Sequence, residues 1–170
     1  AVPKTFRDYN RVASFFTRGC NAASPTQYGS TVAIGNVVVS PSEFMPRLFA
    51  ENGRLLDSQG RITLDTPEAL RALENYRETY SYSDRTIYDF WKNALEGFAD
   101  GTAAMTVVFI NYASHILNSQ MSRIAGKLGF APVPGGKPLL GGGVIGITQS
   151  CTCPAAACKF LEWLYADLVA

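Results

Sequence analysis

AAMTVVF, residues 103–109, is a nearly continuous run of apolar and β-branched side chains. Its length and composition predict a buried strand, because strands covered on both faces lack the polar alternation of half-exposed ones. A short helical pattern with Leu95 and Phe98 precedes the run and closes near Gly101. Residues 111 to about 126, which follow it, are predicted to form a helix. A strand between two helices indicates a layered domain of the α/β or α+β class.

The N-terminal part continues this alternation. Thr5 can cap a helix, with Asp8 three residues on as its partner in a capping box. After a polar loop, the β-branched residues of 30–34 predict a strand that ends at Gly35. The apolar face expected on the first helix consists of Phe6, Tyr9, Val12, Ala13 and Phe16.

Two further helices are expected in the next part of the chain. One lies within 42–51 and closes at Asn52-Gly53, while Pro46 leaves its start open because proline is tolerated only in the first turn. A short hairpin, or a pair of extended pieces, is expected around the turn 57–60. Thr66-Pro67 begins the second helix, with proline at its first position. Its expected apolar stripe is Leu70, Leu73, Tyr76 and Tyr80.

The C-terminal part has two predicted strands and a helix. Residues 128–131 and 139–148 are the strands, separated by the turn Pro-Val-Pro-Gly-Gly at 132–136. The helix begins at Pro154, and its expected apolar face is Ala157, Phe160, Leu161, Leu164 and Leu168. We therefore predict one α/β lobe over residues 1–170, with a mixed sheet flanked by helices.

Composition and charge exclude several classes of partner. Hydrophobic residues make up 47% and charged residues 17% of the chain, as in ordinary globular domains. The net charge of +1 provides no strong field for nucleic acid or an anionic membrane. No apolar run approaches the roughly 20 residues that cross a bilayer. The opening AVPKTFRDYN lacks the pattern of a signal peptide.

The sequence lacks the motifs of the common catalytic sites. It has no G-x-S-x-G nucleophile elbow, no phosphate-binding G-x-x-x-x-G-K-[ST] and no G-x-G-x-x-G after a strand. His115 is interpreted as a helix-surface or core residue, and the scattered acidic side chains as solvated surface. We therefore expect no catalytic residues and no cofactor.

Four cysteines raise the question of a metal site. Cys151, Cys153 and Cys158 cluster in sequence, whereas Cys20 and the single histidine lie far away. A structural zinc site needs a fourth ligand, so we expect no bound metal. The three clustered cysteines are interpreted as small apolar side chains at a helix start, and a disulfide stays open as an alternative.

Three stretches resemble the bacterial extracellular solute-binding proteins that include the maltose-binding protein. FAENGRLLDSQGRITLDTPEALRALENYRETY (49–80) is similar to the family's turn, extended piece and Ser/Thr-Pro-Glu helix start. FADGTAAMTVV (98–108) resembles its Phe, glycine and Ala-Met pattern. GFAPVPGGKPLLGGGVIGITQSCTCPAAACKFLEWLYAD (129–167) resembles its Pro-Gly-Gly turn, Gly-Gly strand and Ala-rich helix. VPKTFRDY (2–9) is similar to the start of the family's second lobe.

The resemblance implies a two-lobed protein of the type II periplasmic-binding-protein-like fold, with the ligand between the lobes. The chain would be the central part of the C-terminal lobe, with the N-terminal lobe outside this sequence. It would bind a carbohydrate without catalysis and deliver it to the transmembrane subunits of an ABC permease. The resemblance also implies a location in the periplasm or on the outer face of the cytoplasmic membrane, in a secreted or lipid-anchored protein. A non-sugar solute, a sensor role and, less favoured, a small α/β enzyme are the alternatives.

Ligand contacts are expected at the carboxyl ends of strands and at helix N-termini. This rule selects Asn36 after one predicted strand, and Phe109, Asn111 and Tyr112 after another. A ring such as Tyr112 or Trp91 can lie against the apolar face of a sugar. Core packing is the alternative for Phe109, and a lobe-surface anchor or loop packing is the alternative for Trp91.

The glycine-rich strand contributes a second group of expected contacts. Gly142 and Gly143 indicate backbone close to a ligand or a chain crossing, with a bulge or close helix packing as the alternative. Val144 follows them, where many members of the family have Trp. Phe109-Ile110-Asn111-Tyr112 likewise stands where the family often has Gly-x-Trp.

Overall fold

The computed structural model describes residues 2–34, 39–86, 91–143 and 145–166, with the backbone alone for residues 91–93. The chain divides into two compact units, Ala1–Leu139 and Leu140–Ala170. The described helices of the first unit are α1 (Phe6–Phe15), α2 (Val39–Ala50), α3 (Pro67–Ser81), α4 (Trp91–Ala99), the 3-10 helix η1 (Ile110–Tyr112) and α5 (Ala113–Leu117). The second unit contains α6 (Pro154–Ala166).

The first helix begins as the sequence predicts. The Thr5 hydroxyl accepts a hydrogen bond from the Asp8 amide at 3.1 Å and donates to the Asp8 carboxylate at 2.8 Å. The Asp8 carboxylate therefore bonds the Thr5 side chain. In a capping box, this carboxylate would instead accept a hydrogen bond from the Thr5 amide. Of the expected apolar face, Phe6, Tyr9 and Ala13 are buried, and the rest is half-buried.

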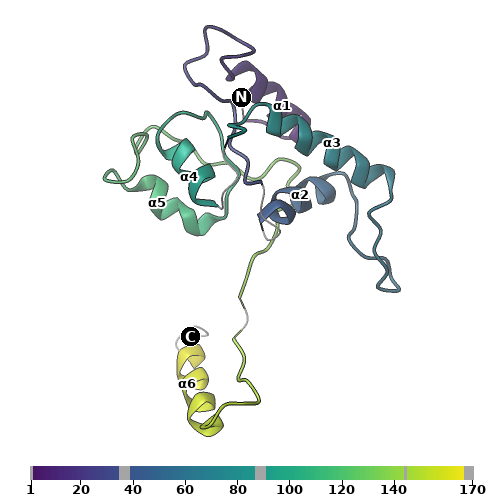
Figure 1. Ribbon diagram of the computed structural model, residues 1–170, viewed down its shortest axis with the longest axis vertical. Helices are drawn as coiled ribbons and strands as arrows, with labels where there is room; N and C mark the ends of the chain where they lie inside the picture. Colours follow the sequence, from purple (N-terminus) through teal and green to yellow (C-terminus); the bar gives the residue numbers. More distant parts are fainter. Residues whose placement is uncertain (1, 35–38, 87–90, 144, 167–170) are drawn as a thin grey trace. The chain divides into compact units, whose positions relative to one another are not determined.

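α3 packs against both α1 and α2 (Figure 1). Its predicted start is confirmed, because the Thr66 side chain accepts from the Ala69 amide and Pro67 follows the cap. The expected stripe is wrong for Leu70 and Leu73, which are 57% and 54% exposed. Ala69, Ala72, Tyr76 and Thr79 form the buried face instead. The two alanines pack on Leu48 of α2, since small side chains let two helices approach closely.

α2 begins earlier than the predicted range, and Pro46, which left the start open, lies in its interior. Its predicted end is confirmed. Asn52 adopts the left-handed conformation at φ 63, and the Gly53 amide bonds the Leu48 carbonyl at 2.9 Å. The hairpin that follows has a single antiparallel bridge between Leu56 and Ile62.

The described residues form no strand of a sheet, so the predicted mixed sheet is not confirmed. The described parts of 30–34, 103–109, 128–131 and 139–148 lack strand structure. The segment 103–109 is buried only at Ala103 and half-buried beyond it, which corrects the expectation of a buried strand. Among the described residues, its backbone bonds to another extended segment go to residues 28–31, and the Ala103 amide bonds the Gly97 carbonyl at 3.2 Å.

The predicted helix over 111–126 is also corrected. It is reduced to η1 and the five residues of α5, and turns follow as far as Gly126. The Asn118 side chain accepts from the Gln120 amide at 2.9 Å, a local bond that competes with helical pairing. α6 begins at Pro154 as predicted, but its described residues include no buried side chain. Leu168 lies outside the described residues.

Among the described residues, no helix has both the length and the apolar character that crossing a bilayer requires.

Candidate functional site

Two segments far apart in sequence run parallel in the first unit. The Tyr28 amide bonds the Thr102 carbonyl at 3.0 Å, and the Ala104 amide bonds the Tyr28 carbonyl at 3.1 Å. The Thr31 amide bonds the Met105 carbonyl at 3.1 Å, which continues the parallel register. The segments therefore extend in the same direction, toward Ala33 in one and Phe109 in the other.

The carboxyl ends of these segments meet the beginnings of two helices. Val39 is the first residue of α2, and Ala94 lies in the first turn of α4. Both are buried together with Ala33, and partly buried side chains from the second segment pack against them. We call this group the edge cluster: Ala33, Val39, Ala94, Val108, Phe109 and Tyr112.

Three predicted contact residues lie at this edge. Phe109 caps η1 in an extended conformation, and the Tyr112 amide bonds its carbonyl at 3.0 Å. Phe109 and Tyr112 are half-buried in the edge cluster, whereas Asn111 is exposed in the turn between them. The chain therefore brings two aromatic rings and an exposed amide side chain to one place. This edge, where strand-like segments end and helices begin, is the kind of position that the sequence rule selects.

The other predicted residues are not brought to this edge by any described contact. Trp91 is the first residue of α4, and its side chain lies outside the described residues, as do Asn36 and Val144. Gly142 and Gly143 are exposed in the second unit. A Cβ atom added at either glycine meets no described heavy atom within 4 Å, so no close contact within that unit explains why these positions hold glycine.

Sequence reasoning missed a buried polar network behind the edge cluster. Glu43 Oε2 lies 3.1 Å from Arg47 Nη1, one turn further along α2. The Arg47 guanidinium carbon lies 4.6 Å from the centroid of the Phe6 ring and 5.1 Å from that of Tyr76. The i, i+4 spacing of Glu43 and Arg47 was the sequence signal for this ion pair, but pairs with that spacing are commonly found on helix surfaces. Only the packing of α1 and α3 around α2 buries this pair.

The network reaches the edge cluster through Ala33. Glu43 Oε1 accepts a hydrogen bond from the Ala33 amide at 3.1 Å, and the Tyr76 hydroxyl donates to the Ala33 carbonyl at 3.2 Å. Burial, with a smaller contribution from the Glu43 carboxylate, raises the pKa of Tyr76 to about 12, so the hydroxyl stays a donor at neutral pH. Burial also raises the pKa of Glu43, while the Arg47 guanidinium and the Ala33 amide oppose that rise.

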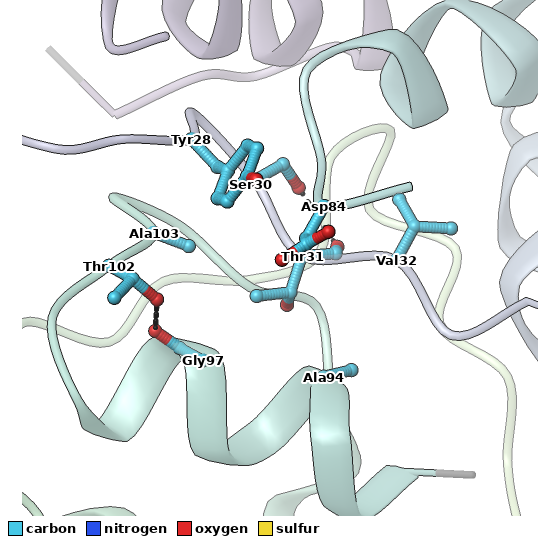
Figure 2. Close-up of a pocket in the computed structure, with 9 residues that line it drawn as sticks. All are labelled: Tyr28, Ser30, Thr31, Val32, Asp84, Ala94, Gly97, Thr102 and Ala103. Carbon is cyan, nitrogen blue, oxygen red and sulfur yellow. Dashed lines mark hydrogen bonds between the residues drawn. The ribbon is translucent and has the colours of Figure 1, made fainter. Parts of the chain in front are cut away.

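A small cavity lies between the two parallel segments and α4 (Figure 2). Its volume is about 30 Å³, and its polar lining includes Tyr28, Thr31, Asp84 and Thr102. The Thr102 hydroxyl is already used, because it donates to the Gly97 carbonyl at 2.6 Å. A space of this size holds one or two water molecules, whereas small-molecule sites measure roughly 300–1,000 Å³. The cavity is therefore not a solute site.

The described residues offer no metal centre, since no three His, Cys, Asp or Glu side chains among them are grouped to hold an ion. Cys20, Cys151, Cys153 and Cys158 are free thiols.

Comparison with known proteins gives a family and a fold. The family model for bacterial extracellular solute-binding proteins matches residues 1–167. A putative ABC transporter periplasmic-binding protein, YcjN of Escherichia coli K12, is 27% identical over 97 residues, which are 57% of this chain and 21% of that protein.

Two solved structures of ABC transporter solute-binding proteins have the same fold as this chain. One, from Agrobacterium radiobacter K84 in complex with ribitol, gives a TM-score of 0.76 at 24% identity over 96% of this chain. The other, from Agrobacterium vitis S4 with bound D-mannitol, gives 0.72 at 19% identity over 99% of this chain. This chain covers 42% of each solved chain. Because the family model matches nearly its whole length, the chain belongs to the bacterial extracellular solute-binding proteins.

Proposed function

We propose that this chain is the central part of the C-terminal lobe of a two-lobed protein that binds a small sugar or polyol for uptake by an ABC transporter. The solute lies between the lobes and is released unchanged to the permease, so the chain has no catalytic role. In the complete lobe, the extended segments belong to a mixed sheet of the type II periplasmic-binding-protein-like fold. The protein acts in the periplasm or on the outer face of the cytoplasmic membrane, secreted or lipid-anchored.

The observation that carries this proposal is the edge cluster. Phe109 and Tyr112 pack there beside Ala33, where α2 and α4 begin, and the Asn111 side chain is exposed in the same turn. An aromatic face suits the apolar C–H surface of a polyol. Amide groups and free helix N–H groups bond its hydroxyls. The edge therefore combines the two kinds of group that such a solute needs.

The remaining predicted residues are also proposed to contact the solute. Asn36 adds a second amide side chain and Trp91 a third ring. Gly142, Gly143 and Val144 supply backbone without a bulky side chain. The two stretches where the family often has Trp contain no Trp here, and a smaller stacking surface favours a small solute over a long oligosaccharide. The ligands of the two solved relatives, ribitol and D-mannitol, support the same size class.

A ligand screen on the complete two-lobed protein tests the proposal. A solute that binds only the folded state raises the melting temperature, by an amount that grows with the ratio of its concentration to Kd. We expect ribitol, D-mannitol or a monosaccharide to raise it and titration calorimetry to give a saturable isotherm. Maltose tests the longer carbohydrates, and L-glutamate tests the non-sugar alternative. Stabilisation by L-glutamate alone would contradict the proposed solute class, and conversion of a bound sugar to a product would contradict the binding-only role.

A further inference from the structure

Residues 30–33 are held in place by side chains from three helices. The Tyr9 hydroxyl of α1 bonds the Ser30 hydroxyl at 2.7 Å, in a buried setting. Three residues later, the Ala33 amide and carbonyl bond Glu43 of α2 and Tyr76 of α3. In a sheet, backbone groups of a strand pair with neighbouring strands. Here, two helices provide both partners of Ala33.

The two side chains that hold Ala33 are themselves constrained by their neighbours. Arg47 lies against Glu43 and against the Phe6 and Tyr76 rings, and its side chain is 2% exposed. The Thr79 hydroxyl donates to the Asn10 side chain at 2.7 Å, which joins α3 to α1 beside the same guanidinium. Buried and hydrogen-bonded groups of this kind have few alternative rotamers. The position of Ala33 is therefore determined by the packing of α1, α2 and α3.

Ala33 is also a member of the edge cluster. It is 1% exposed, and Phe109 and Tyr112 pack against the cluster that it forms with Val39 and Ala94. A shift of Ala33 displaces the surface on which both rings rest. Binding groups lose effectiveness when they move by about 1 Å, because hydrogen bonds and ring contacts depend on close geometry.

We propose that Glu43 and Tyr76 are positioning residues for the solute-binding edge: by holding the amide and the carbonyl of Ala33, they keep Phe109 and Tyr112 in the geometry that binds solute. This inference rests on the proposed function, and it adds two residues that do not touch the solute. It predicts that removal of the Tyr76 hydroxyl weakens solute affinity more than removal of another buried hydroxyl, when both changes lower the unfolding free energy equally.

The test compares Tyr76→Phe with Tyr9→Phe in the complete two-lobed protein. Each variant removes one buried hydroxyl that bonds residues 30–33 and retains its ring, so Arg47 keeps its Tyr76 contact. The Tyr76 hydroxyl also bonds the Ser40 side chain of α2. We expect similar losses of unfolding free energy by urea denaturation. For ribitol and D-mannitol, Tyr76→Phe should weaken binding about 3- to 10-fold, the size of one lost hydrogen bond. The affinity of Tyr9→Phe should stay within about twofold of the wild type, because the Thr31 backbone is separately bonded to Met105. Equal affinities in the two variants would overturn the proposal.

A second measurement needs no solute. Amide hydrogen exchange at Ala33 should be faster in Glu43→Ala, which removes the acceptor of that amide, than in the wild type. Glu43→Gln, which retains an acceptor for the Ala33 amide, should protect Ala33 better than Glu43→Ala. If the wild type bound none of the sugars or polyols, the proposed solute class would be wrong. Equal exchange at Ala33 in Glu43→Gln and Glu43→Ala would refute the anchoring of its amide.

Discussion

Glu43 and Arg47, one turn apart on α2, form an ion pair whose side chains are 3% and 2% exposed. The carboxylate also accepts a hydrogen bond from the Ala33 amide, so one side chain pairs with a buried cation and satisfies a buried backbone donor. A buried guanidinium without a counter-ion is costly, so this pairing stabilises the packed core. This pair links the interior of the three-helix packing to the edge where we place the solute.

Removal of the Glu43 carboxylate should strongly destabilise the chain. Glu43→Ala leaves the Arg47 charge buried without its partner, a change that costs about 3–5 kcal/mol of unfolding free energy. The control is Arg71→Ala, which breaks pairs with Glu51 and Glu68 at 2.8 and 2.9 Å on the surface. Exposed pairs contribute about 0–1 kcal/mol. Urea denaturation followed by circular dichroism measures both, and equal losses would argue against the special role of the buried pair.

Asn111 and Tyr112 should contribute directly to solute affinity. In the complete protein, Asn111→Ala and Tyr112→Ala should each weaken polyol binding about 5- to 100-fold, through a lost hydrogen bond or a lost ring contact of about 1–3 kcal/mol. Neither should unfold the protein, because Asn111 is exposed and Tyr112 half-buried. Gln120→Ala, an exposed amide loss in the turns after α5, is the control. Calorimetry with unchanged affinity would remove both residues from the site.

The 170-residue chain alone should bind its solute weakly. Small ligands in tight sites have roughly 70–90% of their surface buried, and one lobe covers only part of it. If each lobe supplied half of a micromolar binding free energy near −8 kcal/mol, one lobe would retain about −4 kcal/mol, or millimolar affinity. Calorimetry on the chain with the solute identified for the two-lobed protein checks this, and micromolar binding by the chain would contradict the need for a second lobe.

Gly29 should tolerate no larger residue. A Cβ atom at this position would lie 1.8 Å from the Ala13 carbonyl oxygen of α1, a clash with backbone that no rotamer change relieves. Gly29→Ala should therefore lower the unfolding free energy by about 2 kcal/mol or more. Gly19→Ala is the matched control, because a Cβ atom there meets no described atom within 4 Å. Thermal melts of the two variants should differ clearly, and overlapping melts would show that α1 does not pack on Gly29 in solution.

The hairpin turn at Asp57 should depend on pH. Hydrogen bonds from the Arg61 amide and side chain, with a further one from the Gln59 amide, hold the pKa of Asp57 below its ordinary value of 3.8. Since the folded pKa is depressed, the stabilisation is present above that ordinary value and is lost as the pH falls through the folded pKa. Amide resonances of Gln59 and Arg61 should therefore shift with a midpoint below 3.8, and Asp57→Asn should abolish this titration. A midpoint at or above the ordinary value would contradict the turn geometry.

Local signals in the sequence were sufficient for much of the framework. Thr5 and Thr66 identified two helix starts, and Asn52-Gly53 identified a helix end, because caps and left-handed turns depend on residues adjacent in the chain. The order of short motifs along the chain was enough to indicate the family. The rule of strand ends and helix starts also selected Phe109, Asn111 and Tyr112, which the structure brings to one edge.

Tertiary packing decided which faces are buried and which side chains meet. The apolar pattern of α3 favoured Leu70 and Leu73, yet its Ala face is buried, because α2 approaches closely enough to require small side chains. Glu43 and Arg47 have the spacing of an ordinary surface pair. They are buried because Phe6 and Tyr76, which come from other helices, pack against Arg47. A residue's own neighbours in sequence do not specify what covers it. That depends on contacts between segments 30 or more residues apart, whose free energy is set by the packed core as a whole.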